Sequence, residues 1–326
     1  MADREAILVL TTGGTIVSHY DGEGRKRYPD LSASAEPLVA MAERAGQRAE
    51  VEAIASVGSQ DMGRIVWHDL VARIRRAAEE DRWRGVVVTH GTDTLEETAF
   101  LLELLVDPPI ALVLTGAMLA ADNPSSDGPA NFAAALSVAA HVRTAAQGAL
   151  VVMDDEIHAA RRVFKRATHG ARAFASSGEG PVGFVTAGYV EYGSAAAPFP
   201  HRFGQVEPAL LPEVGLLACH ADMNPHLCRA TLAVMPGGVV VAGLGDGNVP
   251  APIAHELAAF VARGGIVVRS SRVDGGRVPC GGEIDDDLMG FVAANDLSPC
   301  KARLLLQCLL ADGETERERI QAAFDA

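Results

Sequence analysis

The sequence predicts a two-part α/β protein: a larger N-terminal domain with a mostly parallel sheet flanked by helices, and a smaller C-terminal α/β domain. The chain has 326 residues, which is more than one typical hydrophobic core requires. Short apolar runs alternate with amphipathic stretches along it. A segment with four prolines and little periodicity interrupts this alternation once. We therefore expect an N-terminal catalytic domain over 1–192, a linker over 193–213 and a C-terminal domain over 214–326.

The N-terminal part contains continuous apolar runs that are typical of buried strands. We expect strands at 6–10, 51–57, 85–90, 110–116 and 148–153. Helical spacing of apolar residues predicts helices at 67–80, 94–106 and 129–143. Strands of this kind, separated by helices, favour a sheet that is covered on both faces.

The same alternation starts again after the proline-rich segment. Apolar runs predict strands at 214–219, 238–243 and 265–271, with helices near 226–235, 252–263 and 300–311. The sequence shows neither an internal repeat nor a low-complexity tract.

Composition and charge limit the classes of partner. Apolar residues make up 48 % of the chain and charged residues 21 %, as in a folded globular protein. The net charge of −14 argues against nucleic acid or an anionic membrane, because both require a basic face. No apolar run approaches the roughly 18 residues of a membrane span. The opening segment has too few apolar residues for a secretory leader. We expect a small-molecule substrate.

Cysteine usage predicts a cytoplasmic location. The five cysteines are odd in number and form no C-x-x-C pair; they are Cys219, Cys228, Cys280, Cys300 and Cys308. Such a pattern indicates buried or surface thiols in a reducing compartment, not a disulfide or zinc framework. We expect no metal and no cofactor.

Loops rich in glycine and hydroxyl residues follow most of the predicted strands. They include "TTGGT", "GSQD", "HGTDT" and "TGAM" in the N-terminal part, and "LGDGN" and "RVDGG" in the C-terminal part. In a parallel sheet the carboxyl ends of the strands share one edge, and ligands bind there. The loops of one sheet should therefore meet at one place, where glycine lets backbone N–H groups approach a ligand.

Two of these loops, and a further segment, "HADMNPH", also have other interpretations. In "HGTDT", Asp93 followed by Glu96, or Thr94 followed by Glu97, fits a capping box at the start of the next helix. "GLGDGN" lacks the G-x-G-x-x-G spacing of a dinucleotide loop. "HADMNPH" could hold a metal, but turn and cap roles for Asp222, Asn224 and Pro225 fit it better.

The motifs in combination resemble the bacterial-type L-asparaginase/glutaminase family. "TTGGT" and "HGTDT", each after a strand, carry the resemblance, and further similar segments follow in the same order: "GSQDM", "TGAM", "DGPANF", "GDGN", "VVRSSRV", "GFVA" and "KARLLLQ". The resemblance covers essentially the whole chain. It implies an amidohydrolase that acts on asparagine and assembles as a homotetramer, and it makes a capping role of "HGTDT" secondary.

The resemblance also implies roles for individual residues. The family's catalytic positions fall on Thr15 as nucleophile and on Tyr28, Thr92, Asp93 and Lys165. Its substrate-binding positions fall on Gly58, Ser59, Gln60 and Ala117, and on Asn248 and Glu283, which would reach into the site of a neighbouring subunit. A threonine hydroxyl needs a nearby base, and backbone N–H groups would stabilise the oxyanion. Lys165 and Tyr28 both remain possible activators.

Two departures from the family pattern concern substrate preference. Pro29 follows Tyr28 where small or hydroxyl residues are expected, at the end of a charged, glycine-containing segment that we expect to be a lid. Asp246 replaces a residue that is often Asn. The alternatives are a glutaminase-asparaginase, or an amidase of the family acting on a related small amide, with little discrimination. A further alternative, from another class, is a non-catalytic amino-acid-binding protein.

Overall fold

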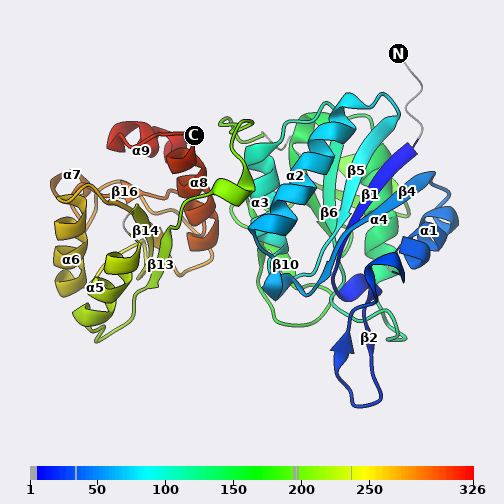
Figure 1. Ribbon diagram of the computed structural model, residues 1–326, viewed down its shortest axis with the longest axis horizontal. Coiled ribbons are helices and arrows are strands. Elements are labelled where there is room, and N and C mark those ends of the chain that lie inside the picture. The colour runs from blue at the N-terminus through cyan, green and yellow to red at the C-terminus, as the bar shows by residue number, and fades with distance from the viewer. Residues whose placement is uncertain (1–5, 34, 194–195, 197, 236) are drawn as a thin grey trace. The chain divides into compact units, whose positions relative to one another are not determined.

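The computed structural model describes residues 6–33, 35–193, 196, 198–235 and 237–326 (Figure 1). The chain divides into two compact units, residues 1–202 and 203–326. Within the described ranges, no helix combines the length and the apolar character that crossing a membrane requires.

An eight-stranded sheet forms the centre of unit 1, in the order β12-β11-β8-β7-β6-β5-β1-β4. Five strands pair in parallel: β1 (Ala6–Gly13), β4 (Ala49–Val57), β5 (Trp83–Thr89), β6 (Ala111–Thr115) and β7 (Ala149–Met153). Three antiparallel strands extend the sheet: β8 (Glu156–Ala159), β11 (Gly183–Thr186) and β12 (Tyr189–Tyr192). Together with the helices below, this sheet confirms the predicted fold class.

Four helices cover the sheet: α1 (Ala35–Arg44), α2 (Arg64–Glu79), α3 (Leu95–Leu105) and α4 (Gly128–Ala140). Helix α1 contacts α4, and α2 contacts α3; Figure 1 shows the two pairs on opposite faces of the sheet. The apolar stripe of α2 explains its orientation, because buried Trp67, Leu70, Val71 and Ile74 recur at helical spacing. Helices α3 and α4 are buried over most of their residues, and the inner parallel strands β1, β5, β6 and β7 are buried on both faces.

Short elements connect the sheet to its loops. Two small hairpins are formed by β2 (His19–Tyr20) with β3 (Lys26–Arg27), and by β9 (Val163–Lys165) with β10 (Phe174–Ser176). Single 3-10 turns occur at Thr15–Val17, Leu31–Ala33, Ser59–Asp61, Thr144–Gln147 and Pro208–Leu210.

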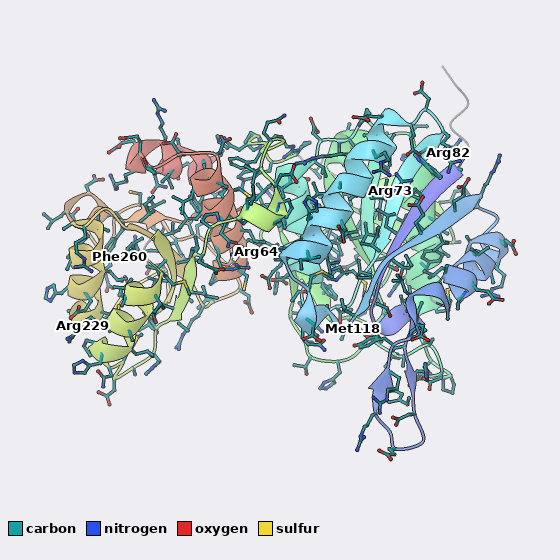
Figure 2. All side chains as sticks on the ribbon, in the orientation of Figure 1. Arg64, Arg73, Arg82, Met118, Arg229 and Phe260 are labelled. Atoms are coloured by element: carbon teal, nitrogen blue, oxygen red, sulfur yellow. The ribbon has the colours of Figure 1, made fainter. Side chains whose placement is uncertain are left out.

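Unit 2 contains a smaller parallel sheet, in the order β13-β14-β15-β16. Its strands are β13 (Gly215–Ala218), β14 (Gly238–Gly243), β15 (Ile266–Ser271) and β16 (Val292–Ala293). Its helices are α5 (Pro225–Val234), α6 (Ala251–Val261), α7 (Asp286–Met289), α8 (Pro299–Ala311) and α9 (Arg317–Asp325). Buried Phe260, labelled in Figure 2, belongs to the apolar cluster of this unit.

The segment 193–213, predicted as a linker, is partly packed. The Phe199 ring meets Phe100 edge to face at a centroid distance of 5.6 Å, and the Phe199 N–H donates to the buried Glu103 carboxylate at 2.7 Å. The prolines therefore mark a break in the periodicity of apolar residues, but Phe199 of this segment packs against α3.

The "HADMNPH" segment forms a turn and a helix cap, as predicted. Asn224 caps α5 by accepting the His226 N–H at 2.9 Å, and Pro225 is the first residue of the helix. Asp222 has the positive φ of 55° that a tight turn requires.

Candidate active site

The loops that follow β1, β4 and β5 lie in direct contact. Gly14 has a φ of +80°, and a Cβ on it would stand 2.5 Å from the backbone N of Gly91. A Cβ on Gly91 would stand 2.7 Å from the Ser59 Oγ. Only glycine fits where two backbones approach this closely. The convergence of loops expected at the carboxyl edge of this sheet is therefore present.

Thr15 lies at the start of the 3-10 turn that follows Gly14. The residue is only 6 % exposed, and its carbonyl accepts the Ser18 hydroxyl at 3.0 Å. The strand-to-turn transition at Gly13 and Gly14, both with positive φ, places Thr15 beside the 90–91 backbone that Gly14 touches.

Ser59 is bonded to the "HGTDT" segment through two contacts. Its Oγ accepts the Asp93 N–H at 3.0 Å, and its carbonyl accepts the Thr94 hydroxyl at 2.7 Å. Thr94 stands at the N-cap of α3 without a side-chain capping bond. The predicted capping box is therefore wrong. The Thr94 hydroxyl donates to the Ser59 carbonyl, and the Glu96 carboxylate accepts the Lys165 N–H.

Lys165 contacts the two polar side chains of the same segment. Its Nζ donates to Thr92 Oγ1 at 2.9 Å and to Asp93 Oδ1 at 2.6 Å. The Lys165 side chain is 17 % exposed, whereas that of Asp93 is 61 % exposed. Thr92 itself is buried. The Lys165 amine thus joins a buried hydroxyl to a solvent-facing carboxylate.

Tyr28 is half-buried and follows the β2–β3 hairpin. Burial raises the pKa of Tyr28, and the nearby carboxylates of Asp93 and Asp61 raise it further. The phenol therefore keeps its proton across the neutral range.

Ala117 is fully buried in the loop after β6. Asp127 holds this loop by accepting the N–H groups of Met118 and Leu119 at 3.0 and 2.9 Å. Asn131 donates to the Gly116 carbonyl at 3.1 Å. Met118 is labelled in Figure 2. Asp127 and Asn131 belong to the "DGPANF" segment, for which the motif alone indicated no role; their spacing of one helical turn was the available signal.

His90 has a structural role that the sequence analysis did not assign. Its Nδ1 lies 2.6 Å from the Gly91 carbonyl and its Nε2 lies 2.9 Å from the Thr98 hydroxyl, which also accepts the Trp67 N–H at 2.9 Å. Complete burial lowers the pKa of His90 to about 4. The neutral imidazole therefore stabilises the "HGTDT" loop through its contacts with Gly91 and Thr98.

The remaining predicted residues, Gln60, Asn248 and Glu283, have local surroundings of their own. Gln60 follows Gly58 and Ser59 but is exposed, and its amide donates to Asp61 at 3.2 Å. Asn248 and Glu283 belong to unit 2, where the Asn248 amide donates to Asp246 at 2.9 Å and Glu283 is exposed.

A buried ion pair holds both of these unit 2 loops. Arg269 pairs with Asp286 at 2.5 Å, and both side chains are essentially unexposed. The Arg269 guanidinium also donates to the Gly247 carbonyl at 3.0 Å, while Asp286 accepts the Gly281 N–H at 2.7 Å. One pair thereby fixes the residues beside Asn248 and the loop that carries Glu283.

Two further findings concern metal binding and a cavity. The described residues contain no group of three or more His, Cys, Asp or Glu side chains that could hold a metal ion. A cavity of about 320 Å³ is lined by residues of β7, β8, β10 and the loops beside them, and none of the predicted site residues lines it.

Comparison with known protein families agrees with the resemblance carried by the loop motifs. The family described as Asparaginase, N-terminal matches residues 6–197, and the Glutaminase/Asparaginase C-terminal domain matches residues 213–324. The chain belongs to the asparaginase family. This confirms the resemblance seen in the motifs and makes the chain an amidohydrolase, not a non-catalytic binding protein.

Several relatives match this asparaginase-family chain over nearly its full length. It is 35 % identical to L-asparaginase 2 of Escherichia coli over 98 % of this chain and 92 % of the relative. It is 36 % identical to the probable periplasmic L-asparaginase of Haemophilus influenzae over 95 % of this chain and 89 % of the relative. A glutaminase-asparaginase of Pseudomonas fluorescens is 29 % identical over 96 % of this chain and 88 % of the relative.

Proposed function

We propose that this protein hydrolyses L-asparagine to L-aspartate and ammonia through an acyl-enzyme formed on Thr15. The observation that carries the proposal is the pair of bonds from Lys165 Nζ to Thr92 and Asp93, in a segment whose Gly91 abuts Gly14, the residue before Thr15. The names of the L-asparaginase relatives support the substrate.

The reaction proceeds in two halves. The Thr15 hydroxyl attacks the carbon of the side-chain amide, and its proton passes to a base. Backbone N–H groups stabilise the oxyanion, and ammonia leaves when the C–N bond breaks and the nitrogen takes up a proton. Water then attacks the ester, which releases aspartate and returns the proton to Thr15.

We assign proton transfer to Lys165 and Thr92 and not to Tyr28. Lys165 Nζ is already hydrogen-bonded to Thr92 Oγ1 at 2.9 Å, whereas the raised pKa of Tyr28 disfavours the phenolate that it would need to act as a base. Tyr28 would instead serve as a neutral hydrogen-bond donor. The Thr92 hydroxyl accepts from Lys165 and keeps its own proton for a relay.

The amino-acid head of the substrate would be held by groups of opposite charge. Asp93 offers a carboxylate to the α-ammonium, and Glu283 of a neighbouring subunit would offer a second one. The Ser59 hydroxyl accepts from Asp93 N–H and still has its own proton to donate to the α-carboxylate, beside Gly58. Ala117 would meet the side-chain amide, while Gln60 and Asn248 border the head group. The homotetramer and the cytoplasmic location belong to the same proposal.

A second candidate is a glutaminase-asparaginase with little discrimination, because relatives of both names match the chain. A coupled assay of ammonia release tests the two together, with L-asparagine, L-glutamine and a buffer blank. The proposal requires release from asparagine well above the blank. Equal kcat/KM for both amino acids would replace it with the second candidate, and release from neither would refute both.

A further inference from the structure

Lys165 is carried by a hairpin too small to be stable alone. Strands β9 and β10 pair over three positions, with Lys165 opposite Phe174 at the end of β9. A two-stranded ribbon is at best marginally stable in water without support. The position of the Lys165 side chain therefore depends on contacts between this hairpin and the rest of unit 1.

Glu96 of α3 makes such a contact with the backbone of Lys165. The Lys165 N–H donates to Glu96 Oε2 at 2.6 Å, a short bond to a charged acceptor. The following residue, Arg166, instead donates its N–H back within the hairpin, to the Ala173 carbonyl at 2.8 Å. The Lys165 N–H thus faces α3 and not the β10 strand.

The other strand of the hairpin is tied to the large sheet. The Ser176 hydroxyl of β10 lies 2.8 Å from Nδ1 of the buried His158 on β8. Strand β10 is therefore attached to β8, and strand β9, which carries the lysine, is attached to α3 through Glu96.

We propose that Glu96 is a positioning residue for the Lys165 proton relay. The inference rests on the proposed function. The stretch from Thr92 to Glu96 binds both the side chain and the backbone of Lys165. Thr92 and Asp93 bind its Nζ, and Glu96 accepts its backbone N–H. All three contacts therefore come from one loop and the first turn of one helix.

Removal of the anchor should act on the reaction more than on binding. Lysine has a flexible four-carbon stem, so loss of the backbone contact lets Nζ drift away from Thr92 Oγ1. A misplacement of about 1 Å can cost on the order of 100-fold in rate. We expect Glu96→Ala to lower kcat for asparagine by about 10- to 100-fold with KM little changed.

Two variants of the first turn of α3 serve as controls. Glu96→Gln keeps an acceptor oxygen and should retain kcat within about threefold, because the bond to the N–H survives without the charge. Glu97→Ala removes the same charge from the same helical turn and should leave kcat near that of the unmodified protein. If kcat fell only because a charge near the helix dipole was removed, the fall would be the same for Glu96→Ala and Glu97→Ala.

A double-mutant cycle separates positioning from general destabilisation. In a Lys165→Met background, Glu96→Ala should reduce the residual kcat no further, because there is no amine left to position. A further loss of the full single-mutant size would show that Glu96 acts independently of Lys165 and would overturn the inference.

Amide hydrogen exchange tests the anchor without any turnover. Exchange at residues 163–166 should be faster in Glu96→Ala than in the unmodified protein and in Glu97→Ala, while the β1 amides stay protected. If the unmodified protein releases no ammonia, the proposed function fails while exchange still tests the anchor. Unchanged exchange in Glu96→Ala, or an unchanged kcat in an active enzyme, would refute the positioning role.

Discussion

Thr15 owes its proposed reactivity to its surroundings and not to its own chemistry. Its hydroxyl is an ordinary alcohol on a buried residue, the first of the 3-10 turn that follows Gly14. Thr15→Ala should abolish hydrolysis of asparagine, with a loss of at least about 10³-fold in kcat. The free energy of unfolding should change by no more than about 1 kcal/mol, because a loop hydroxyl contributes little to the core.

Steady-state kinetics and denaturant unfolding of Thr15→Ala measure the two quantities. Turnover by this variant near the unmodified rate would exclude Thr15 as the nucleophile. A large loss of stability would mean that the fall in rate reports misfolding.

His90 should make stability depend on pH between about 6.5 and 4. The folded pKa of about 4 lies below the unfolded value, so the unfolded state binds the proton first as pH falls. The stabilisation is complete above about pH 6.5 and is lost as pH falls to about 4, a change of at most about 3 kcal/mol.

Unfolding in urea at pH 7 and pH 4, for the unmodified protein and for His90→Gln, tests this dependence. The variant should start less stable, because it loses bonds to Gly91 and Thr98, but it should lose less stability on acidification. An identical loss in both proteins would contradict the assignment.

Individual residues also show where sequence reasoning stops. The pattern Asp93–Glu96 predicted a cap, and the structure instead gives Glu96 the Lys165 N–H, 69 positions away. Local spacing cannot reveal such a partner, since it depends on where a distant hairpin folds back. The roles of Thr92, Asp93 and Lys165 came from the family resemblance and not from spacing.

At the scale of elements, the longer parallel strands could be predicted, whereas the two-residue parallel strand β16 and the antiparallel strands could not. Strands such as β5 are apolar throughout because both faces are buried. Strands β8 to β12 are only three or four residues long, and their residues carry no clear period. The convergence of loops followed from the parallel order alone, since carboxyl ends share an edge.

The contact between the loops after β1 and β5 gives a test at this scale. In Gly14→Ala the new methyl group would meet the backbone at Gly91 and His90, at 2.5 to 2.8 Å, in a left-handed conformation. We expect a loss of stability of about 1–3 kcal/mol from backbone strain alone, with a fall in kcat as the loops separate.

Gly22→Ala is the matched control for this substitution. Gly22 lies in the exposed β2–β3 turn with nothing near its would-be Cβ. Thermal unfolding and kinetics should hardly change in that variant. If Gly14→Ala behaved in the same way, the close approach of the two loops would not matter for the site.

The segment after β3 should set the preference between asparagine and glutamine. Pro29 restricts the backbone of Tyr28, and its own carbonyl accepts the Ser56 hydroxyl of β4 at 2.5 Å. Tyr28 is thereby less able to adapt to a substrate with one more methylene. We expect asparagine to be favoured over glutamine by at least about tenfold in kcat/KM.

Substitution of Pro29 should reduce that preference. Pro29→Ser frees the angles of Tyr28 and should raise kcat/KM for glutamine relative to asparagine. Both values should be measured in the same preparation. A ratio that stays constant in Pro29→Ser would place the discrimination elsewhere in the pocket.

At the scale of the whole molecule, the residues proposed for the site come from both units. Unit 1 carries Thr15, Lys165 and their partners, whereas Asn248 and Glu283 lie on unit 2 loops that the Arg269–Asp286 pair holds. The sequence predicted both units from a single break in periodicity. No periodicity or spacing shows which copy of unit 2 completes a given site, so that part came from the family resemblance.

Reassembly of two inactive variants tests whether a neighbouring subunit completes the site. In a symmetric pair the two sites are equivalent, so a mixed pair of Thr15→Ala and Glu283→Ala has one site with both changes and one with neither. Random mixing makes half of the pairs mixed, and half of their sites are intact. About a quarter of the unmodified activity should therefore return after joint unfolding and refolding. The control is Thr15→Ala mixed with Lys165→Met: both changes lie in unit 1, no mixed pair contains an intact site, and no activity should return. Recovery in the control, or none in the first mixture when size-exclusion chromatography with light scattering shows mixed oligomers, would mean that each chain builds its site alone.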